Sequence, residues 1–80
     1  MNIQDMLTKI TEIEKRRNVV IYINYDTTIG WKFSMYGGSG SAKVGLTRTI
    51  PPNQIAIWDI VILEGFLESM ADGIEIGVTN

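Results

Sequence analysis

The sequence predicts an α+β fold, and three observations lead to this class. The first 17 residues place apolar side chains at helical spacing, residues 19–49 contain alternating runs separated by turn residues, and residues 53–72 are apolar at helical spacing again. We therefore expect an N-terminal helix, a three-stranded antiparallel meander, a long apolar second helix and a short C-terminal strand. The length indicates a single domain, 1–80.

The N-terminal helix has recognisable ends. Asn2 can cap its first turn, with Asp5 three positions on, and Asn18 can adopt the left-handed conformation that ends a helix. The basic run at 15–17 fits the last turn, where positive charge complements the helix dipole, although phosphate-binding patches also contain such runs. The apolar stripe expected on the core consists of Ile3, Met6, Leu7, Ile10 and Ile13.

Residues 19–25, 31–36 and 42–49 are predicted to be the three strands, because β-branched and aromatic residues alternate with polar ones. Residues 26–30 form the first turn, and the glycine-rich loop 37–41 forms the second. Alternation places one set of side chains on the core and the other set on the outward face of the sheet. The outward set comprises Val20, Tyr22, Asn24, Lys32, Ser34, Tyr36, Lys43, Gly45 and Thr47.

The stretch 53–72 is predicted to be one helix because Pro51 and Pro52 precede it and Gly73 follows it. Its β-branched content also fits a buried strand, and periodicity does not separate the two for short apolar runs. Residues 74–78 then alternate between apolar and other side chains, which indicates the short C-terminal strand. The helix face expected on the sheet consists of Ile55, Trp58, Ile62, Phe66, Leu67 and Met70.

Three apolar side chains of this stretch, Ile57, Ile60 and Val61, point away from that face. An 80-residue domain has little other surface with which to bury them. We therefore expect a second copy of the chain to cover them, in a homo-oligomer built through the 53–72 helix. Coverage by the N-terminal helix is the alternative.

Composition excludes several classes of function. With no histidine, the usual zinc sites, proton shuttles and Ser/His/Asp triads lose their commonest member, so we predict no metal site and no cofactor. The absence of cysteine suits a reducing compartment, and no signal peptide or membrane span is recognisable, so we expect a cytoplasmic protein. The net charge of −2 offers no general attraction to phosphate, so nucleic acid is not the expected partner.

The outward sheet face combines aromatic rings, ammonium groups and hydroxyls, which suits a small planar or anionic ligand such as a nucleotide. The glycine-rich loop adds backbone amides, although it lacks the Gly-Lys pair and the following helix of a P-loop. An ordinary solvated sheet face has a similar composition and is the alternative. The candidate ligand-binding residues are Tyr22, Lys32, Tyr36, Gly38, Ser39 and Lys43.

Asp59 stands out as a carboxylate within the apolar stretch. If it were buried without a partner, its pKa would rise and it could serve as the acid or base of a small enzyme. A paired carboxylate is the favoured interpretation, because no nucleophile, orienting group or metal set accompanies Asp59. Glu64 and Glu68 lie one helical turn apart on what reads as a solvated face.

Two resemblances are visible. The order helix, three strands, helix is similar to that of double-stranded RNA-binding domains, but those open the second helix with a basic motif where residues 51–54 here read Pro-Pro-Asn-Gln. The opening at residues 2–5, Asn-Ile-Gln-Asp, followed by Leu7 and Ile10, resembles the small inhibitor proteins that phages direct against bacterial nucleases. The chain lacks the dense acidic surface by which several such inhibitors imitate DNA.

The sequence thus predicts a small, non-enzymatic, homo-oligomeric binding or inhibitor protein. It would capture a small anionic or nucleotide-like ligand or, as the second resemblance implies for a phage-encoded protein, block a host protein. A small enzyme that uses Asp59 and a nucleic-acid-binding module are the alternatives from other classes.

Overall fold

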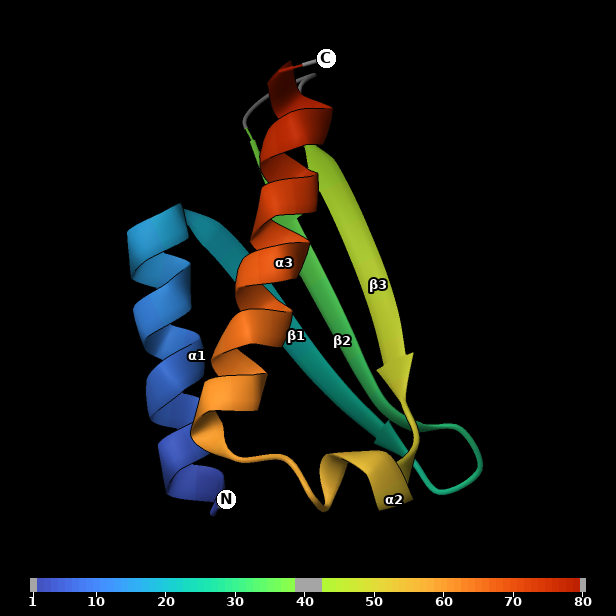
Figure 1. The fold of residues 1–80 in the computed structure, drawn as a ribbon. Coiled ribbons are helices and arrows are strands. Elements are labelled where there is room, and N and C mark those ends of the chain that lie inside the picture. Colours follow the sequence, from blue (N-terminus) through green and yellow to red (C-terminus); the bar gives the residue numbers. More distant parts are fainter. Residues whose placement is uncertain (1, 39–42, 80) are drawn as a thin grey trace.

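Two long helices pack on one face of a three-stranded antiparallel sheet (Figure 1). The computed structural model describes residues 2–38 and 43–79, the last two by their backbone alone. The predicted α+β class and the order helix, three strands, helix are confirmed. The elements are α1 (Ile3–Arg17), β1 (Val19–Asp26), β2 (Gly30–Gly37), β3 (Val44–Ile50), α2 (Pro52–Ile55) and α3 (Ile60–Thr79).

The sheet has β2 at its centre, with β1 and β3 antiparallel on either side. In this register Tyr22 lies opposite Ser34, which in turn lies opposite Thr47. The first turn is held by Asp26, whose carboxylate accepts hydrogen bonds from the backbone N–H groups of Thr28 at 2.7 Å and of the following residue at 3.2 Å. The predicted hairpin is therefore present, with tight pairing along its whole length.

α1 begins and ends as the sequence predicts. The side chain of Asn2 accepts a hydrogen bond from the backbone N–H of Asp5 at 2.8 Å, and Asn18 takes the left-handed conformation at φ 54°. The predicted apolar stripe is too wide, because Ile3 and Leu7 are exposed. Only a narrower line meets the core, and it consists of Met6, Ile10 and Ile13.

The prediction of one helix over residues 53–72 is wrong, because two helices separated by a four-residue linker occupy this stretch. After α2, the backbone N–H groups of Ile57 and Trp58 donate to carbonyls three residues earlier, at 3.3 and 3.1 Å, which tightens the chain into a turn. The Trp58 side chain is buried, and its ring lies 5.1 Å from that of Phe66. The free energy gained by burying this large ring compensates for the interruption of the helix.

Asp59 directly precedes α3 and caps its first turn. Its carboxylate accepts a hydrogen bond from the backbone N–H of Ile62 at 2.9 Å, and its carbonyl accepts one from Leu63 at 3.1 Å. An acidic N-cap satisfies an otherwise unpaired amide and complements the helix dipole. Because α3 starts anew here, Leu63 enters the core, whereas Ile62, predicted to face the sheet, is 46% exposed.

The predicted C-terminal strand is also wrong, because α3 continues through Gly73 to Thr79. A Cβ atom on Gly73 would lie only 2.7 Å from Cδ1 of Leu46, so this glycine permits close contact between α3 and β3 rather than ending the helix. One residue later, Ile74 is buried against Gly37 of β2. Contacts between α3 and the sheet thus favour a helix here, although the local alternation of side chains favours a strand.

The core lies between the sheet and the two long helices. The ring of Phe33, from the central strand, packs edge to face against Phe66 at 5.2 Å between centroids. The largest fully buried side chains come from both layers and are Ile13, Phe33, Met35, Leu63 and Leu67.

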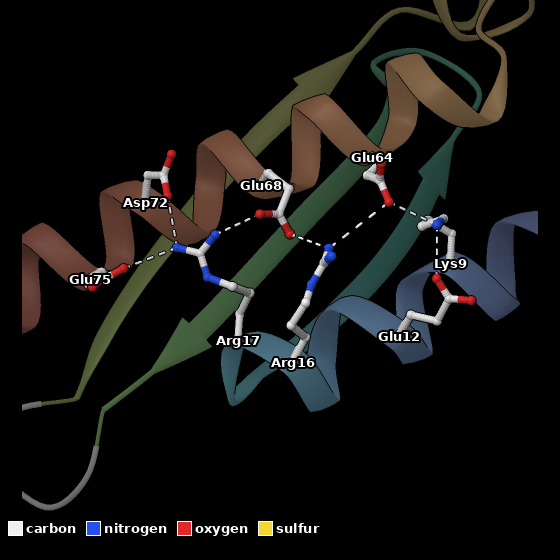
Figure 2. Close-up of polar contacts among 8 residues, drawn as sticks. All are labelled: Lys9, Glu12, Arg16, Arg17, Glu64, Glu68, Asp72 and Glu75. Carbon is white, nitrogen blue, oxygen red and sulfur yellow. Dashed lines mark hydrogen bonds and ion pairs between the residues drawn. The ribbon is translucent and has the colours of Figure 1, made fainter.

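α1 and α3 run in the same direction, and ion pairs join their facing sides (Figure 2). Nζ of Lys9 lies 2.8 Å from Glu64, and the guanidinium of Arg16 lies 2.6 Å from Glu68. The predicted solvated face of Glu64 and Glu68 is therefore turned towards α1. Arg17 extends the line by contacting Glu68, Asp72 and Glu75 at 2.7, 2.8 and 3.1 Å.

These ion pairs lead to a pH-dependent stability. The hydrogen bond from Lys9, with its charge and that of Arg16, holds the pKa of Glu64 below its ordinary value. A lowered carboxyl pKa stabilises the fold above the unfolded pKa, and this contribution is lost as the pH falls through the folded pKa. We expect Glu64→Gln to lower the urea midpoint at pH 7 and to have a smaller effect at pH 3.

The matched control is Asp5→Asn, which removes an exposed carboxylate that forms no ion pair among the described residues. Within the part of the chain that the structure describes, the Asp5 carboxylate interacts only with the dipole of α1, so the effect of this variant on the midpoint should change less between pH 7 and pH 3 than that of the Glu64 variant. Equal losses for Glu64→Gln at both pH values would contradict the assignment of this ion pair as a stabilising contact.

Candidate functional site

The face of the sheet opposite the helices is the candidate site. The register places Val20 beside Tyr36, and Tyr36 beside Gly45, all pointing away from α1 and α3. Within the described residues, no helix covers this face, so its side chains are available to a ligand. The predicted alternation is confirmed along the three strands, although β3 begins at Val44, one residue after Lys43. Thr49, which lies opposite Lys32, is a further outward position.

A hollow of about 340 Å³ lies at one end of this face, lined by Val20, Tyr22, Ser34, Tyr36 and Lys43. Three of the six predicted ligand-binding residues, Tyr22, Tyr36 and Lys43, are therefore brought together. Val20 was placed on the outward face by the alternation but was not predicted as a site residue. Its apolar side chain, 48% exposed, forms one wall.

The two tyrosine rings form the aromatic part of the hollow. Their centroids lie 5.8 Å apart with the planes at 72°, so the edge of one ring meets the face of the other. A Cβ atom on Gly45 would lie 2.7 Å from Cδ1 and Cε1 of Tyr36, so the Tyr36 ring rests directly over this glycine. Tyr22 is the more exposed of the two, at 62% against 37%.

Ser34 forms the floor of the hollow and is buried, although alternation placed it on an exposed face. Its hydroxyl lies 3.3 Å from the hydroxyl of Thr47 on β3, and either oxygen can donate. Tyr22 on β1 and Thr47 on β3 lie opposite Ser34, so larger residues flank this short side chain on both neighbouring strands. The hydroxyl pair is a cross-strand contact that helps to hold β2 against β3.

The other predicted site residues lie elsewhere. Lys32 lines a second hollow on the same sheet face, together with Asn24 and Thr49. Gly38, at φ +87°, lines a hollow on the helix side with Arg17, so it does not belong to the tyrosine site. Ser39 lies outside the described residues, as does most of the predicted glycine-rich loop. Because the glycine-rich loop lies close to Lys43 in the sequence, it was predicted to join the lysines and tyrosines in one cluster. The described residues do not form that cluster.

Both outer strands carry side chains that occupy their edges. The backbone N–H of Ile21 on β1 donates to the carboxylate of Glu14 at 2.9 Å, and the carbonyl of Thr47 on β3 accepts from the guanidinium of Arg48 at 3.2 Å. Side chains that occupy edge amides and carbonyls disfavour the addition of a further strand. The face of the sheet, rather than its edge, is therefore the better candidate for binding.

A second surface feature lies where the chain enters α3. Ile57 and Val61 are 79% and 70% exposed, while Ile60 is partly buried against the core. Ile62 joins the exposed set, although the sequence placed it on the sheet. We call Ile57, Val61 and Ile62 the α3 patch. Its neighbour Gly65 has no atom within 4 Å of where a Cβ would lie, so the helix surface beside the patch is bare.

Asp59, the residue proposed for an enzymatic alternative, is exposed and serves as the N-cap of α3. It therefore lacks the burial on which that alternative depends. Among the described residues, no group of three or more His, Cys, Asp or Glu side chains is placed to hold a metal ion. Nor does any helix in residues 2–38 and 43–79 combine the length and apolar character needed to cross a membrane.

Comparisons of the chain with protein-family models, with curated proteins and with solved structures gave no match. The functional argument therefore rests on the residues of the open sheet face and of the α3 patch.

Proposed function

We propose that the chain is a non-enzymatic binding protein that holds a planar anionic ligand, of nucleotide type, in the hollow formed by Tyr22, Tyr36 and Lys43. The observation that carries this proposal is the position of an exposed tyrosine pair beside a lysine on a sheet face that no described helix covers. The hollow, at about 340 Å³, falls within the range of small-molecule sites.

Each part of the hollow has a chemical role in this proposal. The exposed ring of Tyr22 provides a surface on which a base can stack, and the Val20 side chain excludes water from one side. Lys43 supplies a positive charge for phosphate, and it forms no ion pair with any residue that the structure describes. The hydroxyl of Ser34 offers a donor and an acceptor at the floor.

The test is a titration with adenosine monophosphate and, separately, with inorganic phosphate, followed by backbone NMR shifts. We expect shifts at Tyr22, Tyr36 and Lys43. Lys43→Gln should weaken nucleotide binding by about tenfold, which corresponds to about 1.4 kcal/mol, and Tyr22→Leu should weaken it by a similar factor through the lost stacking. The matched control is Lys15→Gln, an exposed lysine on α1.

An absence of shifts with both probes, or shifts confined to residues outside the hollow, would rule out the proposed site. A response to inorganic phosphate equal to that to the nucleotide would also count against it, since the tyrosines would then contribute nothing.

We also propose that the protein self-associates through the α3 patch, so that a second copy covers Ile57 and Val61. The carboxylates of α3 that form ion pairs are turned towards α1, which leaves the outward side of the helix uncharged from Val61 past Gly65 to Ser69. Two such stretches of α3 can meet about a twofold axis without placing charged side chains of one helix against those of the other. A partner protein on the same patch, as an inhibitor would require, is the alternative occupant.

A further inference from the structure

The charges of this protein are segregated between its two layers. Eight of its nine acidic residues lie on the helices or in the linker before α3, and Asp26 is the exception. The helix layer neutralises much of its own charge through the ion pairs between α1 and α3 (Figure 2). Lys32 and Lys43, by contrast, lie on the open sheet face without an ion-pair partner among the described residues. The net charge of −2 is that of the whole chain and therefore does not describe the charge of this face, which carries the two lysines.

The hollow around Lys32 continues the face from the tyrosine site. It measures about 370 Å³ and lies further along the same strands, because Asn24 follows Tyr22 by two residues and pairs with Lys32. Asn24 and Thr49 supply an amide and a hydroxyl that can bond to a base or a sugar. Asp26 also lines this hollow, and the backbone amides of the turn, which donate hydrogen bonds to its carboxylate, lower its pKa and keep it ionised. Its oxygens are directed at those amides, so Lys32 is the group in this hollow that can meet a phosphate.

The two lysines are too far apart for one nucleotide. Lys32 pairs with Thr49, which lies six positions beyond Lys43 along the chain, so the lysines are separated by about 20 Å at the usual rise of a strand. At the rise of a stacked single strand, this distance corresponds to roughly six nucleotides, and to fewer when the strand is extended.

We propose that the open sheet face binds a short single strand of nucleic acid across both hollows, with phosphates at Lys43 and Lys32 and a base stacked on Tyr22. This inference rests on the proposed function and extends it from a mononucleotide to a strand. A tyrosine ring can stack only on an unpaired base, and a sheet face with two lysines provides neither a groove-reading element nor enough positive charge for a duplex.

The experiment uses fluorescence anisotropy with labelled hexathymidylate and trithymidylate, and NMR titration with thymidine monophosphate. We expect the hexamer to bind at least fivefold more tightly than the trimer. Lys32→Gln should abolish this gain and leave the trimer unchanged, whereas Lys43→Gln should weaken both. Each phosphate contact adds about 0.7 to the slope of log affinity against log salt, so Lys32→Gln should reduce the hexamer slope by about that amount.

Lys15→Gln, on α1, is the control and should change neither affinity nor slope. Equal affinities for the hexamer and the trimer would overturn the proposal that a strand spans both hollows, and so would a hexamer affinity that Lys32→Gln does not change. Either result would leave the nucleotide site in place. If Lys15→Gln and Lys32→Gln reduced the affinity for the hexamer equally, the binding would be non-specific charge attraction and the proposal would be overturned. Tighter binding of a duplex of the same length would overturn the single-strand assignment. A failure of thymidine monophosphate and hexamer alike would remove the proposed function as well.

Discussion

Leu67→Ala is expected to destabilise the protein by about 2–5 kcal/mol, the usual cost of emptying a fully buried leucine site. Leu67 lies on α3 within the core between helices and sheet. A domain of 80 residues has a total stability of roughly 4–12 kcal/mol, so this single change removes a large share of it. Urea unfolding followed by circular dichroism measures the loss directly.

Leu7→Ala is the matched control because it makes the same substitution at an exposed position on α1. We expect it to change stability by no more than about 0.5 kcal/mol, as is usual for surface sites. If the two variants lost equal stability, the assignment of Leu7 to the surface and Leu67 to the core would be incorrect.

Replacing Ile57 and Val61 together by glutamate is expected to convert a dimer into a monomer. Both side chains are largely exposed in one chain, so the substitutions leave the core intact, and a glutamate in the first turn of α3 is favourable with the helix dipole. In the associated form, four carboxylates would face one another at the seam, which opposes pairing. Light scattering should then give the mass of one chain, 9.0 kDa, in place of twice that mass.

Ile29→Glu is the control, because this isoleucine is also exposed but lies in the turn after β1. It should leave the mass unchanged. A wild-type protein that already has the mass of one chain, or a dimer that survives the double substitution, would refute pairing through the α3 patch. Retained far-ultraviolet circular dichroism would show that a change of mass does not arise from unfolding.

The stretch before α3 shows why part of the fold could not be predicted. Helical periodicity runs through residues 53–72, and nothing in it marks a break at Trp58. The break depends on burial of that ring against Phe66 and on the capping of Ile62 by Asp59. Asp59 stands out in the sequence, and an acidic residue immediately before an apolar helical run is a signal for an N-cap.

The candidate site shows a similar division. Alternation alone placed Tyr22, Tyr36 and Lys43 on one face, because side chains in a strand point to opposite sides in turn. It did not reveal that Lys32 lies in a different hollow, since this depends on the register between strands. The register also pairs Tyr36 with Gly45, and the ring of Tyr36 lies directly over this glycine because it has no side chain.

The sequence by itself determined the class of the fold, the limits of α1, the hairpin and the outward face of the strands, because helix caps and the two periodicities are local properties of the chain. Only the tertiary structure decided that α3 runs on past Gly73, that Glu64 and Glu68 pair with α1, and which apolar side chains remain exposed. These outcomes depend on contacts between residues far apart in the chain, where close packing of Ile74 against the sheet outweighs the local preference for a strand.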